Sequence, residues 1–272
     1  MDKNNPYADV NQGMDIAGII KRLKNNEISP EEAERQLKIG AFEQLSYIAK
    51  VDIHRAKRVG IPEAILADCK TDEDIVSIAR IHLEHEGRAI ITRACGNNYT
   101  SLKKLASDEG VGIRWNEKAR IVVIGEAVPS TGGKVGVISA GTADIPVAEE
   151  AKVIAEEMGC SVTAIYDAGV AGIHRLFPEL AKLVENGVDA IVVAAGREGT
   201  LPAIVSGLVD VPVIGIPVST GYGAGGKGEA ALLSMLQSCS VLTVVNIDAG
   251  FVAGAFAARI ANIAAKHRNQ KG

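Results

Sequence analysis

Four turns in the second half of the sequence hold residue types that bind phosphate or transfer protons. The first turn, Ser139–Pro146, places hydroxyl side chains, a glycine and an aspartate directly before a predicted helix. A helix N-terminus has free backbone N–H groups, which favour a bound anion. We therefore expect this turn to bind ribose or phosphate through four residues: Ser139, Gly141, Thr142 and Asp144. Asp144 could equally be a simple N-cap of the helix.

The second and third turns contain groups suited to acid–base chemistry. In Asp167–Arg175, the imidazole of His174 could act as a general acid or base, and Arg175 could bind a phosphate. The same two residues would also suit the solvated start of a helix. In Gly196–Pro202, the carboxylate of Glu198 is flanked by glycines at the end of a predicted strand. A carboxylate in that position is more often functional than a packing residue, so we favour a catalytic role for Glu198 over a packing one.

The fourth turn, Gly221–Glu229, is a glycine-rich loop that imitates two nucleotide-binding motifs. It satisfies G-x-G-x-x-G with Asp248 about twenty residues further on, but that motif belongs in the first strand-to-helix turn of a dinucleotide-binding fold. It also approaches a P-loop, except that Gly228 stands where a Ser or Thr would bind magnesium. We expect a flexible loop whose backbone amides bind phosphate at four glycines: Gly221, Gly223, Gly225 and Gly226.

The four cysteines are scattered and form no C-x-x-C pair or zinc-binding spacing. We expect Cys69, Cys95 and Cys160 to be structural. Cys239 could be an inert buried residue or a nucleophile. Because it follows a predicted helix and precedes a predicted strand, it should lie at the amino edge of its own sheet. It reaches a crevice at the carboxyl edge only if the helix kinks or a neighbouring subunit supplies it.

The elements that must position these turns alternate between strand and helix. Five apolar, β-branched segments predict buried strands: Val135–Ser139, Val162–Tyr166, Ala190–Ala194, Val213–Pro217 and Val241–Asn246. Helix-period segments follow them: Pro146–Met158, Ile173–Asn186, Leu201–Leu208, Gly228–Leu236 and Gly254–His267. This alternation predicts a flavodoxin-like α/β domain, a doubly wound parallel sheet, over residues 127–272. Ligands of such sheets bind beyond the carboxyl ends of the strands.

Residues 1–126 predict a smaller α+β domain, followed by a linker at Glu126–Lys134 that is rich in glycine and hydroxyl residues. Helices are expected over Ile16–Asn25, after Ser29 as an N-cap, and over Thr71–Glu86. Expected strands are Val51–Lys57, Ala64–Ala67 and Ala89–Thr92, and a hairpin is expected from Gly112–Trp115 and Arg120–Gly125. His82 and His85 could bind a metal, but we expect both on a solvated helix face.

Composition excludes several classes of protein. The 272 residues carry 29 Lys and Arg against 33 Asp and Glu, a net charge of −4, which disfavours a nucleic-acid-binding protein. The longest apolar stretch, Gly250–Ala265, is short for a membrane span and is interrupted by Arg259. The polar segment Met1–Gln12 has no signal-peptide core. We therefore expect a cytoplasmic protein that binds neither nucleic acid nor membranes.

The four turns, taken together, resemble those of PurE-type aminoimidazole ribonucleotide carboxylases. The sequence is more similar still to the LarB family, whose members begin the synthesis of the nickel-pincer cofactor. This closer resemblance rests on Tyr166–Arg175, Leu233–Cys239 and Val245–Asp248, and in the first half on Ser29–Ala33 and Asp52–Glu63. Two features depart from the family pattern, namely Arg197, where a small apolar residue or Met is expected, and the apolar Ala249 and Val252 after Asp248.

The resemblance implies an enzyme that carboxylates C5 of the pyridinium ring of nicotinic acid adenine dinucleotide and cleaves its phosphoanhydride. CO2 or bicarbonate would be the co-substrate, and the products would be pyridinium-3,5-biscarboxylic acid mononucleotide and AMP. It further implies that Cys239 attacks the ring, that Glu198 lies in the active site and that the chains form octamers. Phosphoanhydride cleavage favours Mg²⁺, which Asp144 or Asp248 could hold. We expect the first half to recognise the adenylate end of the substrate, because PurE-type enzymes lack this half.

The sequence also allows two other functions. One is a PurE-like carboxylase or mutase acting on aminoimidazole ribonucleotide, which Cys239 and the first half disfavour. The other is a non-catalytic nucleotide-binding protein with the same fold. A dinucleotide-dependent dehydrogenase is disfavoured more strongly, because its glycine motif would lie after the wrong strand.

Overall fold

The computed structural model describes residues 16–40, 43–45, 49–51, 55, 59–221 and 223–271. The polar segment Met1–Gln12, and most of the strand expected over Val51–Lys57, lie outside these residues. None of the helices in the described ranges is long and apolar enough to cross a membrane.

The second half of the chain forms a five-stranded sheet in which all pairings are parallel. Its strands are β7 (Lys134–Ser139), β8 (Ser161–Ile165), β9 (Ala190–Ala195), β10 (Val213–Pro217) and β11 (Thr243–Val244). Their order is β11-β10-β9-β7-β8, so the chain runs outward from β7 to β8 and then crosses back to β9. This is the flavodoxin-like order, and the predicted fold class is confirmed. The order reverses between β7 and β9, which is where such folds bind ligands.

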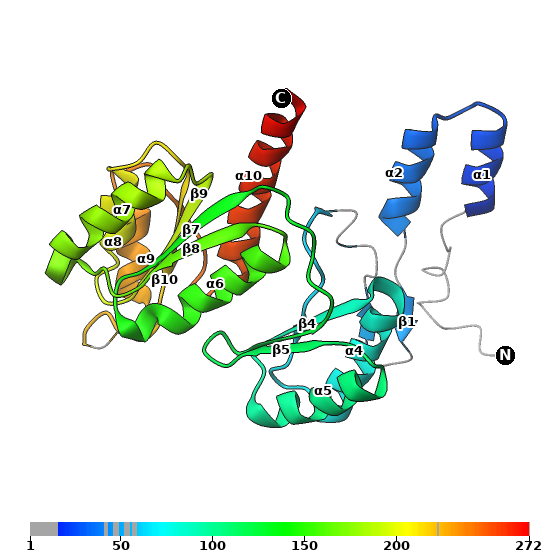
Figure 1. Cartoon of the computed structure of the whole chain (residues 1–272), viewed down its shortest axis with the longest axis horizontal. Helices are drawn as coiled ribbons and strands as arrows, with labels where there is room; N and C mark the ends of the chain where they lie inside the picture. The colour runs from blue at the N-terminus through cyan, green and yellow to red at the C-terminus, as the bar shows by residue number, and fades with distance from the viewer. Residues whose placement is uncertain are drawn as a thin grey trace, which may run out of the picture.

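Helices cover both faces of this sheet (Figure 1). One face packs against α6 (Ile145–Glu157) and α10 (Gly250–Lys271). The other packs against α7 (Leu176–Glu185), α8 (Leu201–Ser206) and α9 (Glu229–Leu236). Alternate residues of each strand point to the two faces, so Val192 belongs to the first apolar cluster and Val193 to the second. Two short 3-10 helices, η1 (Thr142–Asp144) and η2 (Val170–Arg175), follow β7 and β8.

A second sheet in the first half has the order β3-β4-β6-β5. Its strands are β3 (Ile65–Leu66), β4 (Arg88–Thr92), β5 (Ile113–Asn116) and β6 (Ile121–Gly125). The predicted hairpin is confirmed, because β5 and β6 pair antiparallel. Helix α4 (Asp72–Glu86) was expected, whereas α5 (Gly96–Asp108) was not. The segment that opens α5, Gly96–Asn98, consists of weak helix formers, and the side chain of Asn98 stabilises the turn by accepting from the Cys95 N–H.

The remaining elements of the first half are α1 (Ile16–Lys24), α2 (Pro30–Gly40), β1 (Glu43–Leu45) and β2 (Ala49–Val51). The expected cap of α2 is present, since the Ser29 hydroxyl accepts from the backbone N–H of Glu32 at 3.2 Å. Strands β1 and β2 pair antiparallel. Of the strand expected over Val51–Lys57, Val51 is the end of β2, whereas Arg55 is helical, so the expectation is wrong at that residue.

The layer formed by α6 and α10 lies between the two sheets. Its apolar cluster includes Ile90 of β4 and Ile121 and Val123 of β6, so one face of the four-stranded sheet packs on it. Ion pairs reinforce the contact, because Arg88 and Arg114 both contact the carboxylate of Glu157 on α6. The two halves of the chain thus share one continuous core at this layer.

A second contact between the halves centres on Glu149 of α6. Asn116 of β5 donates to its carboxylate at 2.6 Å, and the Tyr166 hydroxyl donates as well. Burial opposes ionisation of Glu149, but these hydrogen bonds outweigh it and hold the pKa of this carboxyl below its ordinary value. The carboxylate therefore links α6 to both β5 and the end of β8.

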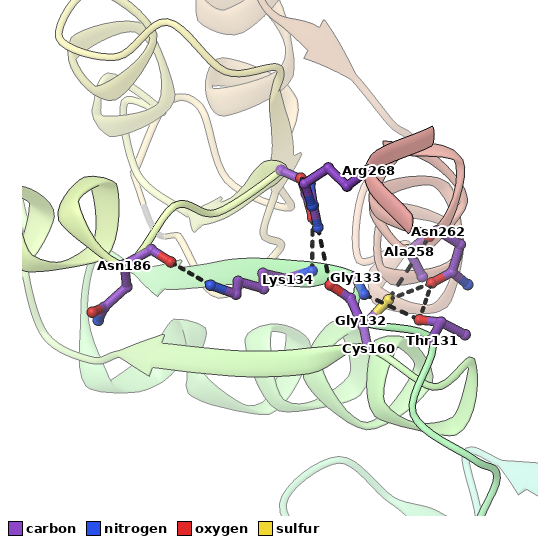
Figure 2. Close-up of polar contacts among 10 residues, drawn as sticks. Thr131, Gly132, Gly133, Lys134, Cys160, Asn186, Ala258, Asn262 and Arg268 are labelled. Carbon is purple, nitrogen blue, oxygen red and sulfur yellow. Dashed lines mark hydrogen bonds and ion pairs between the residues drawn. The ribbon is translucent and has the colours of Figure 1, made fainter. Parts of the chain in front are cut away.

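The amino edge of the five-stranded sheet is held by a polar network (Figure 2). Asn262 of α10 donates to Met158 O at 2.9 Å and accepts from the Thr131 hydroxyl and the Cys160 thiol. Arg268 contacts the Asp189 carboxylate and donates to Gly132 O. These contacts join the linker to the end of α10, and the linker is fixed rather than loose at residues 131–133.

Gly254 permits the close approach of α10 to α6. A Cβ at this position would lie 2.8 Å from the Ala151 Cα, well inside a normal contact. We expect Gly254→Ala to lower the free energy of unfolding by about 1–3 kcal/mol, because α10 must move away from α6. The exposed Arg259→Ala on the same helix should change it by less than about 0.5 kcal/mol. Urea unfolding of both variants checks this, and equal stability of the two would contradict the close-packing account.

Candidate active site

The carboxylate of Asp144 joins three turns at the carboxyl edge of the sheet. Its Oδ2 accepts from the Gly141 N–H at 2.8 Å, within the turn after β7. Its Oδ1 accepts from the Gly196 N–H at 3.1 Å, after β9, and from the Thr220 hydroxyl at 3.4 Å, after β10. The side chain is almost fully buried at 6% exposure. Asp144 therefore fixes the relative positions of the turns that surround it.

A cavity of about 620 Å³ lies against these turns, at the expected switch point between β7 and β9. Its size is typical of a site for a small organic ligand (roughly 300–1,000 Å³). Five residues predicted from sequence line it: Gly141, Thr142, Asp144, Arg175 and Glu198. The cavity thus brings together residues from the first, second and third turns of the sequence analysis.

The two carboxylates of this cavity have different environments. Burial raises the pKa of Asp144 above its ordinary value, opposed by the N–H groups of Gly141 and Gly196, and the nearby Glu198 raises it further. Glu198 itself is exposed to the cavity. A buried, fully hydrogen-bonded Asp144 suits a positioning role, whereas the accessible Glu198 suits proton transfer to a ligand.

Asp167 and Arg175 form an exposed ion pair at the cavity wall, with Arg175 Nη1 2.5 Å from Asp167 Oδ2. Asp167 has φ of 57°, and Arg197 on the opposite turn has φ of 46°. Left-handed backbone is uncommon for such residues and often marks a functional site. Asp167, Arg197 and Thr220 are not among the site residues predicted from the sequence. The signal for Asp167 was its position directly after the strand expected over Val162–Tyr166.

Several predicted site residues lie outside the cavity lining. Ser139 is fully buried, and its hydroxyl accepts from the Asp167 N–H at 3.2 Å, so it supports the turn from below. His174 is exposed on η2 and does not line the cavity. Gly221 of the glycine loop lies against the Arg197 turn, where a Cβ would be 3.2 Å from the Arg197 N atom, but Gly221 does not line the cavity. The other three glycines predicted to bind phosphate, Gly223, Gly225 and Gly226, do not line it, and Tyr222 lies outside the described residues.

Cys239 is exposed and lies at the opposite edge of the sheet from the cavity. It precedes β11, whose Thr243 pairs with Ile214 near the amino end of β10. The neighbouring Val241 O accepts from Ser206 at the end of α8, which also lies at the amino edge. Helix α9 ends at Leu236 without carrying Cys239 across the sheet. Within one chain, Cys239 therefore does not reach the cavity, as the order of the elements predicts.

The remaining cysteines and histidines differ in their surroundings. Cys160 is buried, and burial raises the pKa of its thiol to about 11, which suits the expected structural role. Cys69 and Cys95 are exposed. The expectation of a solvated face is wrong for His82, which is 2% exposed on the packed side of α4. It holds for His85, which is exposed.

Asp144 and Asp248, the two candidate metal ligands, differ in how many of their carboxylate oxygens accept hydrogen bonds. Both oxygens of Asp144 already accept hydrogen bonds, which leaves it poorly suited to a cation. Asp248 accepts from the Ser219 N–H through Oδ1 at 2.9 Å. Across the part of the chain that the structure describes, no three His, Cys, Asp or Glu residues gather as metal ligands would. The described side chains therefore do not form a magnesium site by themselves.

A second cavity, of about 310 Å³, lies between the two halves of the chain. Arg93 lines it from the first half, and Glu150 and Asp248 line it from the second. Burial raises the pKa of Glu150 to about 7, opposed by the charge of Arg93 and by a hydrogen bond from the Phe251 N–H. This cavity is not predictable from the sequence, because its lining comes from segments far apart in the chain.

The raised pKa of Glu150 predicts how stability depends on pH. Its pKa in the folded protein exceeds the ordinary value of 4.5, so ionisation costs the folded state more than the unfolded chain. Relative to Glu150→Gln, the wild type should be most stable below pH 4.5, lose stability as the pH rises to about 7, and stay constant above. Urea unfolding of the two proteins across this interval measures the difference. Parallel pH curves would contradict a buried, titrating Glu150, and the exposed Asp210→Asn serves as control.

Residues 134–271 match the family described as AIR carboxylase. Together with the strand order and the cavity at the switch point, this match defines the second half as a PurE-like α/β domain. Residues 42–126 match the family described as LarB/PurE-like N-terminal domain. The chain, with both domains in this order, belongs to the LarB family.

Related proteins fall into two groups. The uncharacterized protein MJ0165 of Methanocaldococcus jannaschii is 40% identical over 260 residues, which cover 92% of this chain and 98% of that protein. The N5-carboxyaminoimidazole ribonucleotide mutase of Pyrococcus horikoshii is 35% identical over 136 residues, 47% of this chain and 72% of the mutase. The corresponding mutase of Thermotoga maritima is 31% identical over 134 residues, 48% of this chain and 75% of the mutase. The mutases thus match about half of the chain, whereas the first protein matches nearly all of it.

Proposed function

We propose that this protein is a carboxylase that adds CO2 to C5 of the pyridinium ring of nicotinic acid adenine dinucleotide and hydrolyses the phosphoanhydride. The observation that carries the proposal is the combination of a PurE-like cavity containing Glu198 with the LarB-like segment that ends at Cys239. The products would be pyridinium-3,5-biscarboxylic acid mononucleotide and AMP. The relatives named as mutases of a carboxylated ribonucleotide support carboxylate chemistry in the same domain.

The chemistry explains why this enzyme needs a nucleophile. A pyridinium ring is electron-poor, and its C5 does not attack CO2 unaided. When the Cys239 thiolate forms a C–S bond at a neighbouring ring carbon, the ring becomes a neutral dihydropyridine whose C5 is an enamine carbon. C5 then forms a C–C bond to CO2. Loss of the C5 proton and departure of the thiolate restore the aromatic ring, so no oxidant is needed.

The residues of the cavity suit the other parts of this reaction. The exposed carboxylate of Glu198 is the candidate to accept the C5 proton. Arg175 would exchange its ion pair with Asp167 for one with a phosphate of the substrate. Thr142 and the backbone N–H groups of its turn would hold the mononucleotide. Asp144 positions these turns without needing to contact the ligand. His174 is a candidate proton shuttle because it lies beside Arg175 on η2.

A neighbouring subunit must supply Cys239 if it acts in this cavity, because its own chain holds it at the opposite edge of the sheet. Its surroundings suit a subunit contact. Leu233 is 57% exposed, Leu236 is 62% exposed and Val241 is 94% exposed, all close to Cys239 in sequence. Exposed apolar residues grouped in this way mark association surfaces. The proposed homo-oligomer, an octamer in the family, would bury them and complete the site.

Magnesium is a prediction that rests on the resemblance. Mg²⁺ in proteins is often held by substrate phosphates with one or two carboxylates. In this reaction it would lie on the pyrophosphate of the dinucleotide and neutralise charge during hydrolysis. The roles proposed for Cys239, Glu198 and Arg175 do not depend on Mg²⁺.

The products of the reaction test the proposal directly. The purified protein is incubated with nicotinic acid adenine dinucleotide, Mg²⁺ and isotopically labelled bicarbonate, and the mixture is analysed by mass spectrometry. We expect AMP and a labelled mononucleotide that is heavier by one carboxylate group. Unchanged dinucleotide, with folded and oligomeric protein, would contradict the proposal.

The role of Cys239 predicts a sharp difference between two exposed cysteines. Cys239→Ser should abolish label incorporation, because a hydroxyl is a far weaker nucleophile than a thiolate. Cys95→Ser is the matched control, and it should retain near wild-type activity because Cys95 lies at the start of α5, outside the cavity. Circular dichroism and sedimentation should show the same fold and oligomer for both variants. Full activity of Cys239→Ser would rule out the covalent mechanism.

The mutase relatives support one second candidate, a carboxylase or mutase that acts on an aminoimidazole ribonucleotide. That substrate is already an enamine, so its reaction would not require Cys239. Offering it with bicarbonate in the same assay separates the two candidates. Turnover of this ribonucleotide by the Cys239→Ser variant would favour the second.

A further inference from the structure

The cavity between the two halves of the chain has the chemistry of a nucleotide site and no role in the proposed carboxylation. Its apolar wall consists of Leu66 on one side and Phe251 and Val252 on the other. Carboxylates at Glu150 and Asp248 face it from the second half, and the first half contributes Glu63 and Arg93. The Arg93 guanidinium also donates to Asp68 at 3.1 Å. An apolar wall suits a base, carboxylates accept from ribose hydroxyls, and arginine binds phosphate.

Asp248 is the residue that most clearly presents an acceptor to this cavity. Its Oδ1 is held by the Ser219 N–H, and no described side chain hydrogen-bonds to its Oδ2. The residue adopts φ of 55°, and Arg93 across the cavity adopts φ of 54°. Half of the eight non-glycine residues with positive φ in the described ranges line one of the two cavities: Arg93, Asp167, Arg197 and Asp248. Non-glycine residues with positive φ often occur at ligand-binding sites.

The two cavities are neighbours across a single stretch of backbone. Thr220 lines the larger cavity and donates to Asp144, while the preceding residue, Ser219, donates to Asp248 in the smaller one. Consecutive Cα atoms are about 3.8 Å apart, so the residue that holds Asp248 in the smaller cavity and the residue that lines the larger one are direct neighbours in the chain. A dinucleotide with one nucleotide in each cavity would pass its pyrophosphate across Ser219 and Thr220, beside the glycine loop.

We propose that the cavity between Arg93 and Asp248 binds the adenosine monophosphate half of the substrate, with a ribose hydroxyl on Asp248 Oδ2. This inference rests on the proposed function and adds the location of the second nucleotide. At about 310 Å³ the cavity suits one nucleoside and is too small for the whole dinucleotide. The arrangement gives the first half of the chain a role in substrate recognition. It also places the phosphoanhydride at the junction of the two cavities.

Calorimetric titration of the full chain with AMP, and separately with nicotinic acid mononucleotide, tests the inference. Asp248→Asn keeps an oxygen for the Ser219 N–H and tolerates positive φ, but it removes the charge. It should weaken AMP binding at least about tenfold and leave mononucleotide binding within about twofold. Val252 is exposed and lines the same cavity, so Val252→Trp should narrow the cavity and also weaken AMP binding, with mononucleotide binding unchanged. The exposed Asp210→Asn should bind both ligands as the wild type does.

The outcomes separate this inference from the proposed function. If AMP binds both cavity variants as tightly as the wild type, or binds none of the proteins, the inference is wrong even where the wild type forms carboxylated product. If Arg175→Ala weakens AMP binding and Asp248→Asn does not, AMP occupies the larger cavity and the inference is equally wrong. If the cavity variants lose AMP binding while the wild type forms no carboxylated product, the nucleotide site stands and the proposed function fails.

Discussion

The buried carboxylate of Asp144 is the interaction on which the candidate site depends. It accepts hydrogen bonds from turns that follow β7, β9 and β10, three strands that are separated in sequence but adjacent in the sheet. Burying a carboxylate costs free energy unless its oxygens are satisfied, and here both oxygens are. The result is a fixed frame for the turns that carry Thr142 and Glu198, which line one cavity together with Arg175 from the turn after β8. The same frame leaves Asp144 itself little capacity for a metal or substrate.

The layer formed by α6 and α10 makes the two halves of the chain act together. It packs against the five-stranded sheet on one side and against Ile90, Ile121 and Val123 of the smaller sheet on the other. Gly254 allows these two helices to come close. The second cavity lies at the end of this layer, where Glu150 of α6 meets the start of α10. A substrate that spans both cavities would therefore be held by one continuous core.

The sequence predicted the larger domain well because its strands are apolar and its turns carry strong signals. The strand Val213–Pro217 was placed without error, and the three strands before it were found with shifts of one residue at their ends. The last strand is shorter than expected, at Thr243–Val244, and the last helix is longer, at Gly250–Lys271. Helix α5 was missed because Gly96–Asn98 are poor helix formers whose start depends on a side-chain hydrogen bond. The cavity lining was predicted where residues follow strands directly, as for Glu198. Pairings between distant segments, such as Ser219 with Asp248, leave no local pattern, and the cavity between the halves could not be foreseen.

The central claim is that the nucleophile and the acid–base carboxylate of one site come from two chains. It is tested by mixing Cys239→Ser and Glu198→Gln chains, unfolding and refolding them together, and measuring carboxylation by the mixed oligomers. Each variant alone should be inactive. If different subunits supply the two residues, random mixing restores one intact site in four, about a quarter of the wild-type activity. Mixed oligomers that assemble normally yet stay inactive would contradict the claim and place both residues in a site of one chain.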